Sequence, residues 1–194
     1  DRHGIQTMVV GGWSAPWGIA FVADRLACIM LCLSMTVGAV VAVYTVWTVE
    51  PRQQAYFFHP LFQVLLLGVN WSFVTGDLFN LFVGFEVMLI GSYGVTMVGG
   101  TKVQARETLR YLALNSVGST FFVVGCGLVY TTVGTLNFAD LAERSARLGG
   151  EQAALVTAVS MLLLVVFALK AATFPLFSWL PDSYPVVPVG VSGY

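Results

Sequence analysis

Five long runs of apolar residues, separated by short polar stretches, organise this chain of 194 residues. A helix needs about 20 apolar residues to cross the hydrocarbon core of a bilayer. The runs, bounded by charges or by proline and glycine, therefore predict transmembrane helices over 27–47, 56–75, 78–98, 111–133 and 152–180. We expect an all-α, polytopic helix bundle, with residues 1–194 forming a single transmembrane domain.

Two shorter segments complete the predicted organisation. Residues 136–148 place apolar side chains among charged ones, a pattern typical of an amphipathic helix at the membrane interface. A further helix is expected to start after residue 186. The chain begins with Asp1 rather than Met and ends in a run of glycine, valine and serine, so we interpret it as an internal piece of a longer protein.

The segment 152–180 is too long for one simple span and contains both Lys170 and Pro175. Proline removes a backbone donor and frees a carbonyl one turn earlier. In lipid, a freed carbonyl is tolerated only where it faces protein or a wet cavity. We therefore predict a helix that is broken at Lys170–Pro175 and lines the interior of the bundle.

The composition strengthens the membrane assignment. Hydrophobic residues make up 57% of the chain and charged residues 10%, whereas soluble domains average about 25% charged. This excludes a soluble globular enzyme and a disordered chain, and a net charge of −1 argues against nucleic-acid binding. The three cysteines and two histidines do not gather into a metal or cofactor site, so neither a cofactor nor a metal is expected.

Only two charged side chains, Glu86 and Lys170, fall within the predicted spans. A charge at the centre of a bilayer costs about 3 kcal/mol, so both are expected to face the interior and to pair with each other. Burial favours a neutral lysine and a nearby carboxylate favours a charged one, so a lysine between these effects can exchange a proton when its partner moves. The two residues therefore form a candidate proton-transfer pair; a static ion pair that fixes helix register is the alternative.

Several polar residues at helical spacing offer a possible proton path beside this pair. Interhelical hydrogen bonds would explain the serines and threonines equally well. The candidates are Tyr93, Asn115, Ser116, Ser119, Thr120 and Thr173.

Two motifs carry a resemblance to a known family. The run TGDLFNLFVGFEVML at 75–89 resembles the glutamate-bearing helix of antiporter-like membrane subunits, and FALKAATFPLFSWLPDSYP at 167–185 resembles their broken helix with its central lysine. Such subunits occur in Mrp-type multisubunit Na+/H+ antiporters and in respiratory complex I. The opening GGWSAPWGIAFVADRL at 11–26 and the sequence LPDSYP are similar to the D subunit of the Mrp type, whereas complex I relatives usually carry histidines where Phe177 and Tyr184 stand.

The resemblance implies a fold and a function. The family fold has about fourteen helices with two inverted five-helix repeats, of which this chain would hold most of the first. In the family, the positions matched by Glu86 and Lys170 form an ion pair that controls the proton affinity of the lysine. The implied function is proton translocation in a Na+/H+ antiporter, which is a transporter rather than an enzyme. The implied partners are other antiporter subunits, the lipid bilayer, H+ and Na+. The implied location is the cell (inner) membrane, which the protein crosses several times.

A second function stays open at this point. The same pair would serve the proton-pumping membrane arm of a complex I-like NADH:quinone oxidoreductase or a membrane-bound hydrogenase, driven by electron transfer elsewhere. A third interpretation is a non-conducting scaffold with a static pair.

Overall fold

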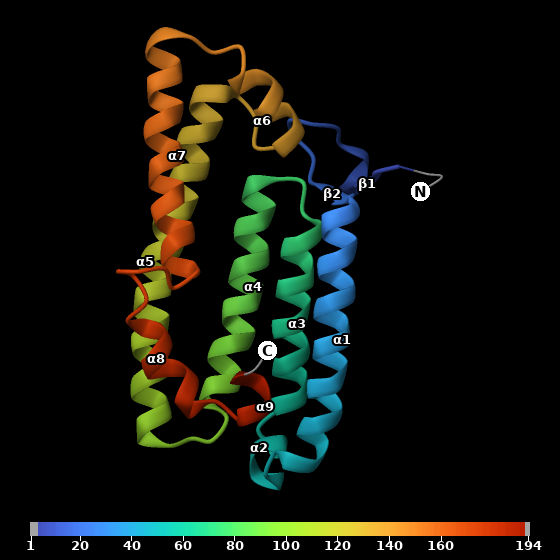
Figure 1. The fold of residues 1–194 in the computed structure, drawn as a ribbon, viewed down its shortest axis with the longest axis vertical. Coiled ribbons are helices and arrows are strands. Elements are labelled where there is room, and N and C mark those ends of the chain that lie inside the picture. Colours follow the sequence, from blue (N-terminus) through green and yellow to red (C-terminus); the bar gives the residue numbers. More distant parts are fainter. Residues whose placement is uncertain (1–3, 193–194) are drawn as a thin grey trace.

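A computed structural model describes residues 4–192 of the chain. Long helices dominate it (Figure 1), and a two-stranded antiparallel sheet precedes them. The strands are β1 (Gln6–Val9) and β2 (Ala20–Ala23), and the helices are α1 (Arg25–Thr48), α2 (Pro51–Ala55), α3 (Phe58–Val74), α4 (Leu78–Met97), α5 (Lys102–Val133), α6 (Phe138–Ser145), α7 (Gly150–Lys170), α8 (Trp179–Ser183) and α9 (Val189–Ser192). Single turns of 3-10 helix lie at Val10–Gly12 and Tyr184–Val186. The apolar pattern does not predict the β-hairpin.

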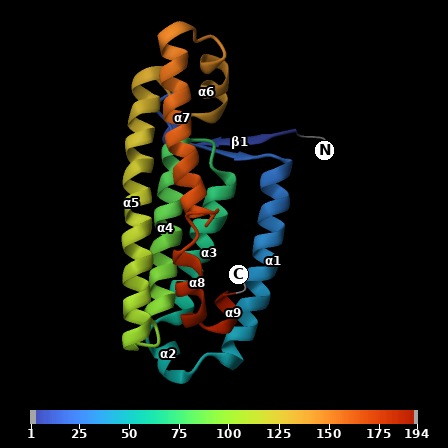
Figure 2. The same cartoon turned by 60° about the vertical axis from the view of Figure 1, so that its left-hand side comes forward.

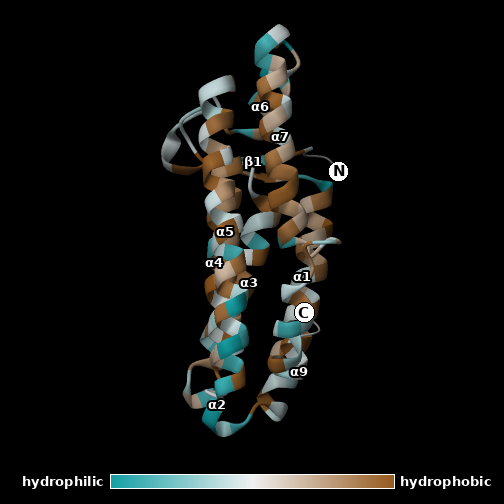
Figure 3. Ribbon diagram, turned by 90° about the vertical axis from the view of Figure 1, so that its left-hand side faces the viewer, coloured by the Kyte–Doolittle hydropathy of each residue, from teal (hydrophilic) through white to brown (hydrophobic). Residues whose placement is uncertain are grey.

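Four helices in the described part of the chain are long and apolar enough to cross a membrane: α1, α4, α5 and α7. The run predicted over 56–75 forms α3, an apolar helix of 17 residues at the short end of what spans a bilayer. The amphipathic segment forms α6, and the turn of helix after residue 186 is α9. Figure 3 shows hydrophobic residues along α5 and α7, with hydrophilic residues at the tip of α7 and around α2.

Capping side chains fix where the long helices α1, α4 and α5 begin. The side chain of Asp24 accepts a hydrogen bond from the backbone of Ala27 at the start of α1, and that of Asp77 accepts one from Asn80 at the start of α4. Thr101 and Gln104 form a reciprocal capping box. Helix α5 consequently begins at Lys102, well before the predicted start at residue 111.

Neighbouring helices pack in the order α1, α3, α4, α5 and α7 (Figures 1 and 2). α3 and α4 approach most closely where glycines face the partner backbone. A Cβ added to Gly68 would overlap the backbone of Met88, and one added to Gly91 would meet the backbone of Leu65. Small residues at such contacts are typical of helix pairs in membranes.

The helix expected over 152–180 is interrupted directly after Lys170, and helical structure resumes only at Trp179. The backbone N–H of Thr173 donates to the carbonyl of Ala168 and that of Ala172 to the carbonyl of Leu169, with Ala172 left-handed at φ 48°. These two bonds form a Schellman C-cap. The helix thus ends on its own backbone bonds before Pro175, rather than being kinked by that proline.

Candidate functional site

Glu86, Ser119 and Lys170 come from three different helices and are joined by hydrogen bonds. The Ser119 hydroxyl on α5 donates to Oε1 of Glu86 on α4, and the Lys170 ammonium at the end of α7 donates to the same hydroxyl oxygen at 3.3 Å. Ser119 is buried, and the two charged residues are half-buried. Among residues 4–192 no direct ion pair joins the carboxylate and the ammonium; the serine hydroxyl links them.

A cluster of aromatic rings lies beside the Lys170 ammonium. The Lys170 Nζ lies 5.4 Å from the ring centroid of Phe85, within the range of a cation–π interaction. Phe85 in turn packs against Phe122 and Phe167, with ring centroids 5.9 and 6.4 Å away. Phe122 is fully buried. These rings exclude water from one side of the ammonium, so the electrostatic interaction between the two charges is stronger than it would be in bulk water.

The break after Lys170 is held by a side chain from beyond it. The Trp179 indole donates a hydrogen bond of 2.9 Å to the carbonyl of Leu169, the residue before the lysine. The Trp179 ring also stacks on Tyr111 of α5 at 5.0 Å. The position of the lysine therefore depends on α5 and α8 as well as on α7.

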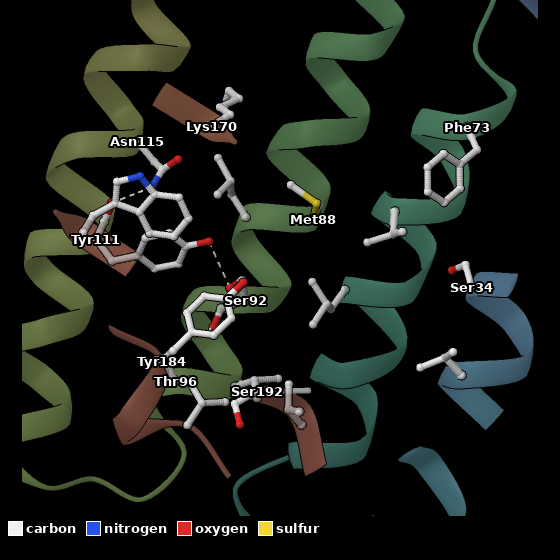
Figure 4. A pocket seen from close by; sticks show the side chains of 18 of the residues that line it. Ser34, Phe73, Met88, Ser92, Thr96, Tyr111, Asn115, Lys170, Tyr184 and Ser192 are labelled. Atoms are coloured by element: carbon white, nitrogen blue, oxygen red, sulfur yellow. Dashed lines mark hydrogen bonds between the residues drawn. The ribbon is translucent and has the colours of Figure 1, made fainter. Parts of the chain in front are cut away.

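A cavity of about 510 Å³ lies between α1, α3, α4, α5 and the segment from α8 to α9. Figure 4 shows Lys170 and Asn115 at one end of this cavity and Thr96 at the other. The Ser92 hydroxyl donates to the Tyr111 hydroxyl at 3.2 Å within the lining. Glu86 is not among the described residues that line the cavity. The lysine, and not the carboxylate, thus faces a space large enough for water.

The structure separates the other predicted path residues into two groups. Asn115 is buried, with its amide donating to the Tyr111 carbonyl at 3.0 Å, and half-buried Tyr93 packs edge-on against Tyr111. The remaining candidates have exposed side chains that do not reach the charged pair: Ser116, Thr120 and Thr173. Positions 115 and 119 face the bundle, and 116 and 120 lie about 100° further round the same helix.

Sequence reasoning missed the residues that position the lysine. From the sequence, Tyr111 is identified only as the start of a predicted helix, and Trp179 only as part of the motif at 167–185. The signal available was an indole N–H nine residues after Lys170, because a buried tryptophan usually finds a hydrogen-bond acceptor. Within 4–192, no group of three or more His, Cys, Asp or Glu side chains is placed to hold a metal ion.

A family model described as NADH:quinone oxidoreductase/Mrp antiporter, TM matches residues 75–193, which include Glu86, Ser119 and Lys170. The chain belongs to this family. It is a multi-pass membrane protein.

Curated relatives agree with this family. The chain is 43% identical to the D subunit of the Na+/H+ antiporter of Bacillus subtilis over 189 residues, and 44% identical to that of Alkalihalophilus pseudofirmus over 191 residues. These matches cover 97% and 98% of this chain but 38% of each relative, so the chain spans about two fifths of their length.

Two solved structures share the fold. The Mrp complex from Dietzia sp. contains a chain with a TM-score of 0.83 and 32% identity, covering 98% of this chain and 35% of that one. The archaeal membrane-bound sulfane sulfur reductase contains one with a TM-score of 0.85 and 32% identity, covering 95% and 37%. The family fold thus occurs in an antiporter complex and in a respiratory complex.

Proposed function

We propose that this chain is part of a proton-translocating membrane subunit of a multisubunit Na+/H+ antiporter, and so of a transporter rather than an enzyme. The observation that carries the proposal is the link from Lys170 through Ser119 to Glu86 in the interior of the bundle. The two relatives named as D subunits of Na+/H+ antiporters support antiport. The partners are then the other antiporter subunits and the cell membrane, with H+ and Na+ as the ions exchanged.

In this proposal, Lys170 gains and loses the transported proton and Glu86 controls how firmly it is held. At an effective dielectric of 20, two opposite unit charges attract by about 3 kcal/mol at about 6 Å, a distance that leaves room for a hydroxyl between them, and by about 4 kcal/mol at about 4 Å. A modest movement of the end of α7 relative to α4 therefore changes the proton affinity of the lysine substantially. The interruption after Lys170 allows such a movement without unfolding α7.

In the proposed pathway, Lys170 exchanges its proton with water in the cavity. Lys170 faces it directly, and Asn115 lies beside the lysine in its lining. Tyr93 contacts the lining through Tyr111. The exposed candidates, Ser116, Thr120 and Thr173, are left outside the proposed path.

The test uses the full-length protein in its assembled complex, in inverted membrane vesicles. Glu86→Gln and Lys170→Ala should each lower Na+-driven proton movement on the order of a hundredfold, a typical contribution of a positioned proton-transfer group. Lys102→Ala is the control, because Lys102 is an exposed charge at the start of α5. Antiport at the wild-type rate in both interior variants would refute the proposal.

A redox-driven proton pump is the second candidate. Two observations favour it: the family model also describes NADH:quinone oxidoreductase subunits, and the sulfane sulfur reductase complex shares the fold. Proton movement in vesicles that depends on an electron donor and not on a Na+ gradient would select this candidate over antiport.

A further inference from the structure

The Ser119 hydroxyl occupies the middle position between the two charged groups. It donates its own hydrogen to the Glu86 carboxylate while its oxygen accepts a hydrogen bond from the Lys170 ammonium at 3.3 Å. A hydroxyl can do both at once because it carries one donor and two acceptor lone pairs. The three groups therefore form a continuous chain of hydrogen bonds in which the lysine donates to the serine and the serine donates to the glutamate.

The packing around Ser119 favours the serine over water as the connecting group. Its side chain is buried at 8% exposure, and α5 and α7 approach so closely that a Cβ added to the adjacent Gly118 would meet Leu169 at 2.8 Å. The Phe122 ring is fully buried one turn further along α5. A water molecule that replaced the hydroxyl would need both space and several polar partners.

No other side-chain hydroxyl in the described part of the chain takes this position. Among residues 4–192, Ser119 is the residue whose side chain hydrogen-bonds to both Glu86 and Lys170. Asn115, one turn earlier, directs its amide to the Tyr111 carbonyl instead. Thr120, the next residue, is exposed and donates to the Ser116 carbonyl of its own helix.

We propose that the Ser119 hydroxyl relays the proton between Lys170 and Glu86. In the forward step, an N–H bond of the Lys170 ammonium breaks and that proton joins the Ser119 oxygen, while the original hydroxyl proton moves to Oε1 of Glu86. The lysine becomes a neutral amine, the glutamate becomes a neutral acid and the serine is regenerated as a hydroxyl. The reverse step restores both charges. This relay deepens the proposed function and rests on it.

The experiment compares Ser119→Ala and Ser119→Thr in the full-length protein within its assembled complex, with the amount of complex in each vesicle preparation measured. Alanine removes the hydroxyl without adding bulk, and threonine keeps it. We expect alanine to lower the antiport rate per complex on the order of a hundredfold and threonine to restore most of it. Thr131→Ala is the matched control, because Thr131 is exposed on the same helix and donates to the carbonyl of Gly127.

A solvent deuterium isotope effect separates a relay from a packing role. Without the relay, proton transfer becomes rate-limiting, so the residual flux of Ser119→Ala should show a larger isotope effect than the wild type. A serine that only packs would lower the rate or the yield of complex with an unchanged isotope effect. That pattern, or a wild-type rate in Ser119→Ala, would overturn the relay.

The same vesicles distinguish this failure from a failure of the proposed function. If Glu86→Gln and Lys170→Ala are inactive while Ser119→Ala is fully active, the charged pair stands and only the relay is wrong. If the two charge variants are fully active, the proposed function itself is wrong.

Discussion

The indole Nε1 of Trp179 donates a hydrogen bond of 2.9 Å to the carbonyl oxygen of Leu169, the residue that precedes the buried lysine. Trp179 lies beyond the interruption, so this bond closes the gap between α7 and α8. The Trp179 ring stacks on Tyr111 of α5. Arg110, also on α5, forms an ion pair with Asp182 of α8, with the Arg110 Nη1 and the Asp182 Oδ2 3.8 Å apart. α5 therefore provides the surface against which the broken helix is held.

Replacing Trp179 by phenylalanine should loosen the lysine while keeping much of the stacking. The net loss is one hydrogen bond, about 1 kcal/mol. We expect a several-fold drop in antiport by the assembled complex and a small drop in its thermal stability. Trp47→Phe is the control, because Trp47 on α1 is 84% exposed. Equal effects of the two substitutions would show that the indole bond does not position Lys170.

The left-handed residue at the end of α7 gives a second prediction. Ala172 has φ 48° in the Schellman cap, a conformation that glycine adopts freely and that costs other residues about 1–2 kcal/mol. Ala172→Gly should therefore raise the thermal stability of the purified full-length protein above that of the wild type. Ala172→Val should lower it below that of the wild type. Ala154→Val is the control, because Ala154 is exposed and lies within α7 away from its ends. Valine there costs at most about 0.7 kcal/mol in helix propensity. Stability that is unchanged by glycine would argue against strain at this position.

The apolar runs correctly indicate an all-α membrane fold, because lipid requires every backbone group to be satisfied within the helix; four of the five runs form helices in the described residues that are long and apolar enough to span, and the fifth forms the shorter α3. Helix ends were harder to predict. α5 begins at Lys102 because the Thr101 side chain caps it. The carboxylate of Glu107, which is 5% exposed, is neutralised by the guanidinium groups of Arg106 and Arg110, whose nitrogens lie 2.7 and 3.2 Å from its oxygens. The apolar pattern stops at the charged residues, whereas the helix continues through them.

The faces of α5 could not be deduced from spacing. Asn115 and Ser119 have the same separation as Ser116 and Thr120, and only the packing of α4 and α7 decides which pair points inward. The sequence offers Ser119 as one of several path candidates, but it does not show that Ser119 lies between the two charges. The sequence predicts direct contact between Glu86 and Lys170, but whether they touch or leave room for Ser119 depends on the distance between helices.

The glycines between α3 and α4 predict a sharp steric effect. Gly68→Ala places a methyl group on the backbone of Met88, and Gly91→Ala places one against that of Leu65. Each should separate the helices and cost about 1–3 kcal/mol, as overpacking typically does. Gly127→Ala is the matched control, because a Cβ there meets nothing within 4 Å. Yield and thermal stability of the full-length protein measure the difference; tolerance of all three substitutions would mean that the helices do not pack this closely.

An ion pair in the short helix α6 responds to pH. The Arg144 guanidinium donates to both carboxylate oxygens of Asp140, at 3.0 and 2.8 Å. This hydrogen bonding holds the pKa of the Asp140 carboxyl below its usual range. Because the folded-state pKa lies below the unfolded one, about 3.9, the pair stabilises α6 above that value and loses its effect as the pH falls through the folded-state pKa.

We therefore expect amide hydrogen exchange in α6, corrected for its intrinsic pH dependence, to accelerate below about pH 4. Asp140→Asn should exchange faster at neutral pH and should lose most of this pH dependence, because the titrating group is gone. Glu143→Gln is the matched control on the same helix: its pair with Arg147 is largely exposed, with 64% of the glutamate side chain accessible, and exposed pairs contribute little. If Glu143→Gln flattened the profile and Asp140→Asn did not, the stability of α6 at low pH would have to come from another group.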